Sequence, residues 1–87
     1  MKPIWVVDDD RSIRWVLEKA LQRAGMPCRL FKEAEEVVVA LKTETPSVLL
    51  SDIRMHDMTG VELLNHVKTV HPEIPVIIMT AFGDLDS

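Results

Sequence analysis

The sequence lacks several features that mark membrane, secreted or nucleic-acid-binding proteins. Its single cysteine, Cys28, cannot form an internal disulfide bond, and its first residues lack the basic and apolar regions of a signal peptide. No apolar run approaches the roughly 20 residues that a membrane-spanning helix needs. The 10 Lys and Arg residues form no cluster and the net charge is −4, whereas binding to nucleic acid depends on a concentrated basic patch. We therefore expect a cytoplasmic protein whose own surface does not bind nucleic acid.

The composition that remains is typical of one small globular domain. The chain has 87 residues, of which 47% are hydrophobic and 28% are charged, and neither a disordered nor a membrane protein has this balance. A domain of this size buries only roughly 60% of the surface that its unfolded chain exposes. We therefore expect a single core and modest stability.

Two kinds of apolar pattern alternate along the chain. Residues 4–7, 48–50 and 76–79 are unbroken apolar runs rich in β-branched side chains, which is typical of parallel strands covered on both faces. Residues 28–31 alternate instead, as in an edge strand. Between these strands, apolar residues at three- and four-residue spacing predict three helices.

The first helix begins after Asp10 or Ser12, either of which can cap it, and ends before Gly25; the other two are expected near residues 34–43 and 60–70. The side chains expected to face the core are Ile13, Val16, Leu17, Ala20, Leu21 and Ala24 in the first helix, Ala34, Val37, Val38 and Leu41 in the second, and Val61, Leu64 and Val67 in the third. Strands that alternate with helices predict an α/β fold, an open parallel sheet with helices on both faces. Ligands bind such sheets at the carboxyl ends of the strands.

Acidic and hydroxyl side chains follow three of the predicted strands. Asp8, Asp9 and Asp10 follow the first strand, Asp52 follows the third and Thr80 follows the last. Carboxylates that crowd together repel one another, and Mg²⁺ relieves this repulsion while accepting several oxygen ligands. The pattern therefore predicts a Mg²⁺ site at which a phosphoryl group is transferred to a carboxylate.

The expected roles of these side chains differ. Asp52 is the expected nucleophile because it alone follows the central apolar strand, whereas the adjacent acids after the first strand are better suited to holding metal. Thr80 can donate a hydrogen bond to the phosphoryl group. Asp10 is better explained as a helix cap than as a ligand.

Three segments resemble the receiver family of two-component response regulators. WVVDDD, LLSDIRM and PVIIMTA occur in the family's order and spacing. IRWVLEKAL and VLLSDIRM resemble the nitrogen-regulation, or NtrC-type, branch. The resemblance covers the whole chain and implies a flavodoxin-like receiver domain over residues 1–87.

The resemblance also implies a role for each residue of the site. Asp52 would be the phosphoacceptor, and Thr80 would be the switch hydroxyl. Asp9, Asp52 and the main-chain carbonyl of Arg54 would bind Mg²⁺, with Asp8 supporting the metal through water. A sensor histidine kinase would donate the phosphoryl group, and downstream ATPase and DNA-binding modules would activate σ54-dependent promoters. The domain would not be an enzyme beyond slow phosphotransfer to its own Asp52.

The chain departs from the family pattern in two places. His56 stands where the family usually has proline, so we expect a freer loop. The chain stops at Ser87, where a fourth helix should begin, so we expect the receiver to lack that helix, the fifth strand, the last helix, the active-site lysine and the switch aromatic. Residues 76–79 would then form an edge strand, which predicts a homodimer or larger oligomer through that strand. Trp15, opposite the apolar stripe, would either contact the missing helix or, with Ile13 and Arg14, help dock the kinase.

Two alternative functions remain open. A phosphatase similar to the haloacid dehalogenases would use the D-x-D motif, with Asp8 as nucleophile and Asp10 as acid and base, but it would leave Asp52 without a role. A pseudo-receiver would keep the fold and signal by protein contact alone. The complete set of Asp8, Asp9, Asp52 and Thr80 argues against that alternative for the parent protein.

Overall fold

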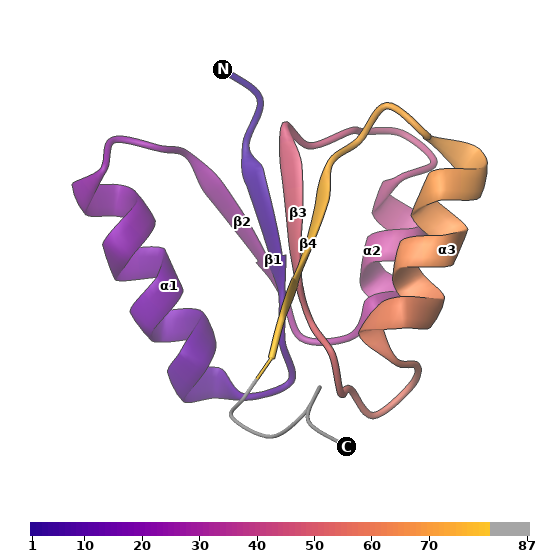
Figure 1. Cartoon of the computed structure of the whole chain (residues 1–87). Helices are drawn as coiled ribbons and strands as arrows, with labels where there is room; N and C mark the ends of the chain where they lie inside the picture. The colour runs from indigo at the N-terminus through magenta and orange to yellow at the C-terminus, as the bar shows by residue number, and fades with distance from the viewer. Residues whose placement is uncertain (81–87) are drawn as a thin grey trace.

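The computed structural model describes residues 1–80, which form a parallel sheet of four strands with helices on both faces (Figure 1). The strands are β1 (Ile4–Val7), β2 (Cys28–Phe31), β3 (Val48–Asp52) and β4 (Val76–Met79), and the helices are α1 (Arg11–Arg23), α2 (Ala34–Ala40) and α3 (Gly60–Val70). The strand order is β2-β1-β3-β4. The predicted fold class is confirmed, and the expected start of a fourth helix lies outside the described residues.

The pairing of the strands sets the position of the acidic residues. β1 and β3 lie at the centre of the sheet, with Val7 opposite Ser51, and β3 pairs with β4 so that Asp52 lies opposite Met79. Asp8 follows β1 directly, and Asp52 is the last residue of β3. The carboxyl ends of these strands therefore carry their acids to the same edge.

The main core lies between the sheet and the pair α2 and α3, on the opposite side from α1 (Figure 1). Trp5 is fully buried there, and its ring centroid lies 5.0 Å from that of Phe31. The core consists of Trp5, Val7, Phe31, Ala34, Val37, Ala40, Leu41, Leu49, Leu63, Val67 and Ile74. Of the inward residues predicted for the second helix, Ala34, Val37 and Leu41 are buried and Val38 packs half-buried against the core, although α2 ends at Ala40 rather than at residue 43.

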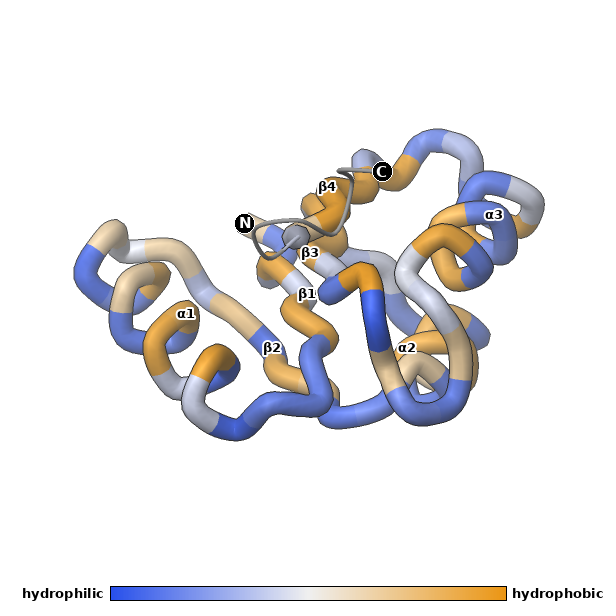
Figure 2. Tube along the Cα trace, turned by 60° about the horizontal axis from the view of Figure 1, so that its bottom comes forward, coloured by the Kyte–Doolittle hydropathy of each residue, from blue (hydrophilic) through white to orange (hydrophobic). Residues whose placement is uncertain are grey.

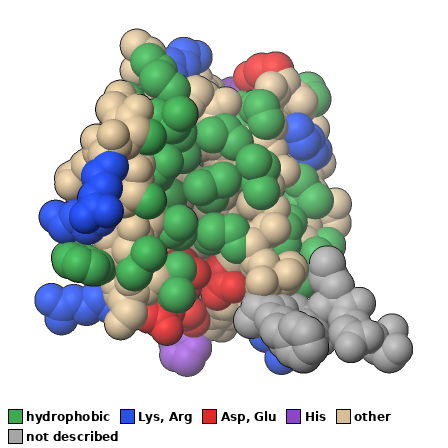
Figure 3. Space-filling view, turned by 60° about the vertical axis from the view of Figure 1, so that its left-hand side comes forward, with side chains coloured by type: hydrophobic (Ala, Val, Ile, Leu, Met, Phe, Trp, Pro, Cys, Tyr) green, Lys and Arg blue, Asp and Glu red, His purple; other side chains and the backbone are tan. Residues whose placement is uncertain are grey.

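The predicted burial of the first helix is wrong. No residue of α1 is buried, since Ile13 is 42% exposed, Val16 is 54% exposed, and Leu17 and Leu21 are only half-buried. The physical reason is that α1 packs only against β1 and β2 among the described strands, so much of its apolar stripe is left uncovered. Figure 3 shows hydrophobic side chains gathered across this side of the molecule. Trp15 is exposed, as predicted, and the Lys19 ammonium lies 5.8 Å from its ring centroid.

The predicted ends of α1 are confirmed. A carboxylate oxygen of Asp10 accepts hydrogen bonds from the backbone N–H groups of Ser12 at 2.8 Å and Ile13 at 3.3 Å. Gly25 follows the helix with a φ of 73°, a left-handed conformation that favours glycine. None of the helices within residues 1–80 has the length and apolarity to cross a membrane.

The buried face of α3 differs from the prediction. Leu63 and Val67 face the core, whereas Val61 is exposed and Leu64 is half-buried. The stripe that contains Val61 and Leu64 and the stripe that contains Leu63 are both apolar. Because Gly60 packs directly against the end of β3, the helix turns the Leu63 stripe toward the core. Thr59 caps the helix by accepting from Glu62 N–H at 3.1 Å, and the Glu62 carboxylate accepts from Thr59 N–H at 2.9 Å.

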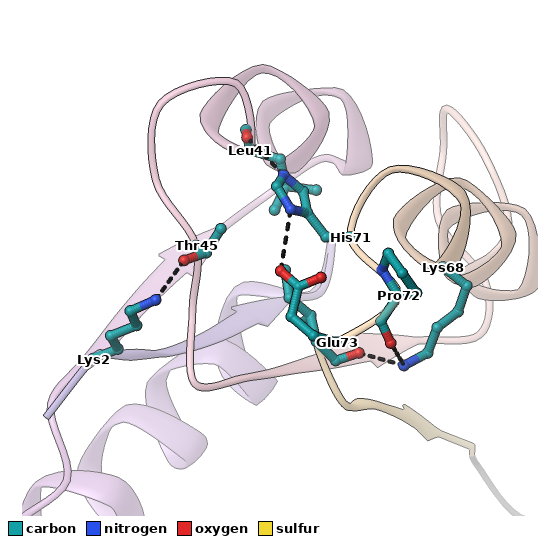
Figure 4. Close-up of polar contacts among 8 residues, drawn as sticks. Lys2, Leu41, Thr45, Lys68, His71, Pro72 and Glu73 are labelled. Atoms are coloured by element: carbon teal, nitrogen blue, oxygen red, sulfur yellow. Dashed lines mark hydrogen bonds and ion pairs between the residues drawn. The ribbon is translucent and has the colours of Figure 1, made fainter.

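Polar contacts fix the turn between α3 and β4 (Figure 4). His71 ends α3, and its ring nitrogens lie 3.3 Å from the Leu41 carbonyl and 3.3 Å from the Glu73 carboxylate. The Lys68 ammonium donates to the carbonyls of Pro72 and Ile74. These contacts hold the turn together and attach it, through His71, to the end of α2.

Candidate functional site

An open cleft of about 660 Å³ lies at the carboxyl edge of the sheet. Figure 2 shows this edge facing the reader, where hydrophobic strands run into hydrophilic loops. The cleft is lined by Asp8, Asp9, Asp10, Ile13, Asp52, Arg54, Met79 and Thr80. All five residues predicted for the site, Asp8, Asp9, Asp52, Arg54 and Thr80, therefore line one cleft.

Three carboxylates of the cleft lie close enough to share a cation. One oxygen from each of Asp8, Asp9 and Asp52 falls within 4.8 Å of the others. Asp8 is buried, Asp52 is half-buried and Asp9 is exposed, so the group opens to solvent on one side. Asp10 is absent from this group because its side chain caps α1.

Hydrogen bonds fix Asp8 at the base of the cleft. Its backbone N–H donates to the Phe31 carbonyl at 3.2 Å, and its carboxylate accepts from Asp10 N–H at 2.8 Å. The Arg14 guanidinium donates to the Asp8 carbonyl at 2.7 Å. The resemblance pointed to Arg14 only as a possible contact with a kinase, and this support for Asp8 was not predicted. The available signal was a cationic side chain in the first turn of the helix that follows the acids.

The electrostatics of Asp8 suit a bound cation. Burial raises the pKa of its carboxyl group above the ordinary value, and the negative charges of Asp52, Asp9 and Asp10 raise it further. The hydrogen bond from Asp10 N–H opposes this rise. A divalent cation would remove the repulsion, and carboxylate oxygens are ligands that Mg²⁺ prefers. The donor set therefore fits Mg²⁺.

The end of β3 is held from two sides. Ile53 N–H donates to the Met79 carbonyl at 3.1 Å, and Gly60 N–H donates to the Ile53 carbonyl at 2.8 Å. A Cβ atom added to Gly60 would lie 2.4 Å from the Asp52 carbonyl oxygen. Only glycine therefore lets α3 begin this close to Asp52. This role was not predicted from the sequence, although a glycine at the start of a predicted helix was a usable signal.

The loop between β3 and α3, residues 53–59, is tied to α2 by Asp57. Its two carboxylate oxygens accept hydrogen bonds from Ala34 N–H at 3.2 Å and Glu35 N–H at 2.8 Å. Partial desolvation raises the pKa of Asp57, but these hydrogen bonds, together with those from the backbone N–H groups of Asp57 itself and Met58, outweigh it and lower the pKa below the ordinary value. The loop expected to be freer because of His56 thus has a tether that the sequence did not reveal.

The geometry disfavours the phosphatase alternative. That alternative needs Asp8 as an accessible nucleophile and Asp10 as a mobile acid and base. Asp8 is only 4% exposed, and Asp10 is engaged with the first turn of α1. Asp52, which the alternative leaves idle, belongs to the carboxylate group. The site is therefore better explained by chemistry at Asp52.

Comparison with known sequences gives one consistent result. The family model "Response regulator receiver domain" matches residues 4–87. The chain is 61% identical over 84 residues to the DNA-binding transcriptional regulator NtrC of Proteus hauseri, which covers 97% of this chain and 18% of that protein. The corresponding identity to NtrC of Escherichia coli K12 is 60%, with the same coverage. The chain thus spans about a fifth of the length of these curated relatives.

Solved structures agree with this result. The apo form of the receiver domain of nitrogen regulatory protein C has a TM-score of 0.84 and 59% identity, covering 98% of this chain and 68% of that chain. The response regulator TrrA of Thermotoga maritima, in complex with Mg²⁺ and BeF, has a TM-score of 0.88 and 28% identity, covering 98% of this chain and 77% of that chain.

Proposed function

Because the chain belongs to the response regulator receiver family, we propose that it accepts a phosphoryl group on Asp52 from a sensor histidine kinase. It is a signalling domain rather than a classical enzyme, and the one reaction we assign to it is Mg²⁺-dependent transfer to its own Asp52. The observation that carries the proposal is the approach of Asp8, Asp9 and Asp52 oxygens to within 4.8 Å of one another.

Five residues of the cleft have a part in this reaction. Asp9, Asp52 and the main-chain carbonyl of Arg54 would hold Mg²⁺, with Asp8 supporting it through water. When bound, Mg²⁺ neutralises the carboxylates and the charge on the phosphoryl oxygens. A carboxylate oxygen of Asp52 forms a bond to phosphorus while the bond from phosphorus to the donor breaks. The Thr80 hydroxyl then donates a hydrogen bond to the phosphoryl group.

The parent protein is proposed to be a cytoplasmic transcription regulator of the nitrogen-regulation type. Its curated relatives are DNA-binding transcriptional regulators that extend well beyond the matched region. We propose that phosphorylation of this domain controls downstream ATPase and DNA-binding modules that act at σ54-dependent promoters. DNA binding would belong to those modules and not to this domain, whose net charge is −4.

Two measurements test the proposal on the 87-residue chain. Mg²⁺ should bind in the millimolar to sub-millimolar range and change tryptophan fluorescence, and Asp52→Asn should abolish the change. A small phosphodonor, or its beryllofluoride mimic, should form an adduct at Asp52 that mass spectrometry or fluorine NMR detects. An adduct that persists in Asp52→Ala but disappears in Asp8→Ala would instead support the phosphatase alternative, and unchanged Mg²⁺ titration in Asp52→Asn would refute the site.

We also propose that the chain self-associates along β4. Within residues 1–80, β4 pairs with β3 alone, so its other edge carries unpaired backbone groups. Ile77 is 53% exposed, and no Lys or Pro interrupts the strand. Light scattering at micromolar concentration should detect a dimer that Ile77→Lys disrupts and that Val61→Lys, a change at an exposed valine of α3, leaves intact. A stable wild-type monomer would contradict this proposal.

A further inference from the structure

Asp57 makes a contact that joins two elements distant in the sequence. It lies in the loop between β3 and α3, and its carboxylate accepts from the first two backbone N–H groups of α2, those of Ala34 at 3.2 Å and Glu35 at 2.8 Å. The two oxygens are engaged one each. Such paired bonds restrain the carboxylate in direction as well as in distance.

The loop that Asp57 holds forms one wall of the cleft. Arg54 lies three positions before Asp57 and lines the cleft beside Asp8, Asp9 and Asp52. The loop is fixed at its start by the hydrogen bond from Ile53 N–H to Met79, and at its end by the bond from Gly60 N–H to Ile53. Asp57 adds a third attachment between these two points. Residues 54–56 are thereby held between fixed positions.

Two observations indicate that this attachment is firm at neutral pH: one concerns the ionisation of Asp57 and the other the packing of its partner. Partial desolvation is outweighed by backbone hydrogen bonds, those from Glu35 and Ala34 among them, which lower the pKa of Asp57, so the carboxylate stays ionised and keeps accepting both bonds. Ala34 is buried in the core and therefore gives the loop a fixed support. The tether connects a rigid part of the molecule to the wall of the cleft.

We propose that Asp57 is a positioning residue for the cation site, which holds the Arg54 segment of the loop in place through its two hydrogen bonds to α2. The inference rests on the proposed function, since it concerns the same cleft. Asp57 is not among the carboxylates whose oxygens fall within 4.8 Å of one another, so it would not itself touch the cation. Its effect reaches the site through the backbone between residues 54 and 57, as with other groups that orient metal ligands from outside the coordination shell.

The first test compares Mg²⁺ binding among variants by tryptophan fluorescence. Asp57→Ala removes both acceptors and should weaken Mg²⁺ binding by about tenfold, the lower end of the range for groups that orient metal ligands. Asp57→Asn keeps one acceptor oxygen and should have an intermediate effect. Glu35→Gln is the matched control, because it removes one exposed negative charge from the same surface while leaving the Glu35 N–H bond to Asp57 in place.

Three readouts separate positioning from charge and from general loss of stability. A charge effect shrinks as salt is raised, whereas a positioning effect persists at high ionic strength. Introducing His56→Pro into Asp57→Ala should restore part of the Mg²⁺ affinity, because proline limits the backbone freedom of the same loop. Hydrogen exchange at the amides of Ala34 and Glu35 should become faster in Asp57→Ala, which reports the loss of the tether directly.

The outcomes distinguish this inference from the proposed function. Loss of Mg²⁺ binding in Asp52→Asn together with wild-type binding in Asp57→Ala would overturn the role of Asp57 and leave the site intact. Unchanged binding in Asp52→Asn would overturn the site itself. An equal weakening in Glu35→Gln and Asp57→Ala would assign the effect to charge and reject positioning.

Discussion

Replacement of Gly60 by alanine is the sharpest test of how the fold builds the site. The added Cβ would lie 2.4 Å from the Asp52 carbonyl oxygen and 3.0 Å from Ile53 Cα, whereas ordinary contact begins at 3.4 Å. Both neighbours are backbone atoms and cannot rotate away. The start of α3 and the end of β3 must therefore separate by about 1 Å, the difference between 3.4 and 2.4 Å.

The size of the effect follows from two opposing terms. Forcing extra volume into a packed site costs about 1–3 kcal/mol, and replacing glycine by alanine in a helix returns at most about 1 kcal/mol. Because both neighbours are backbone atoms, the cost lies toward the upper end of its range, about 3 kcal/mol, and we expect a net destabilisation of about 2 kcal/mol. Because the displaced carbonyl belongs to Asp52, we also expect Mg²⁺ binding to weaken several-fold.

The assay is urea unfolding followed by tryptophan fluorescence, together with Mg²⁺ titration. Gly25→Ala is the control: nothing lies within 4 Å of its added Cβ, but its φ of +73° is strained for alanine. That strain costs about 1–2 kcal/mol and lies outside the cleft, so Mg²⁺ affinity should be unchanged. A Gly60→Ala protein with wild-type stability and Mg²⁺ affinity would refute the reasoning.

Two further predictions concern charged groups. Because the pKa of Asp8 is raised in the folded protein, ionisation of this carboxyl group lowers the free energy of unfolding. The loss of stability is complete above the raised pKa and disappears as the pH falls toward the ordinary value of 3.8. Asp8→Asn should therefore raise the melting temperature in metal-free buffer at neutral pH, with a smaller gain in acid by calorimetry; a lower melting temperature at neutral pH would contradict this. The Arg29 guanidinium lies 2.6 Å from the Glu44 carboxylate, and also 4.8 Å from the Phe31 ring and 5.6 Å from the Trp5 ring. Because the exposed ion pair contributes at most about 1 kcal/mol and the ring contacts about 0.5–1 kcal/mol each, Arg29→Ala should cost more in urea unfolding than Glu44→Ala, and equal costs would reject the ring contacts.

The order of strands and helices was predictable because each element carries its own local signal. The runs at residues 4–7 and 76–79 match β1 and β4, and Asp10 and Gly25 bound α1 as their capping chemistry indicates. Topology then follows from alternation, since parallel strands joined by helices permit few arrangements. The convergence of Asp8, Asp9 and Asp52 is a consequence of that topology.

The burial of helices was less predictable, because an apolar stripe shows which face of a helix avoids water and not what covers it. The stripe of α1 includes Ile13 and Val16, yet both are largely exposed, since the helix covers only β1 and β2. In α3, two apolar stripes compete, and the close approach of Gly60 to β3 selects the one that contains Leu63. Both outcomes depend on contacts between elements.

The difference between a local signal in the sequence and a contact between elements also applies to the site. It explains why the residues that support the site were not predicted. Asp52 and Asp9 are recognisable because their chemistry and their place after a strand are both written in the sequence. Asp57 has no such signature, since its partners on α2 lie 22 and 23 residues away and become neighbours only after α2 and α3 pack on each other. Gly60 is required because it has no Cβ atom, and the sequence does not show that Asp52 occupies the space where a Cβ atom would lie. A substitution at Asp57 or Gly60 can therefore change cation binding while every predicted ligand is retained, so the presence of the acids alone does not establish that the site is competent.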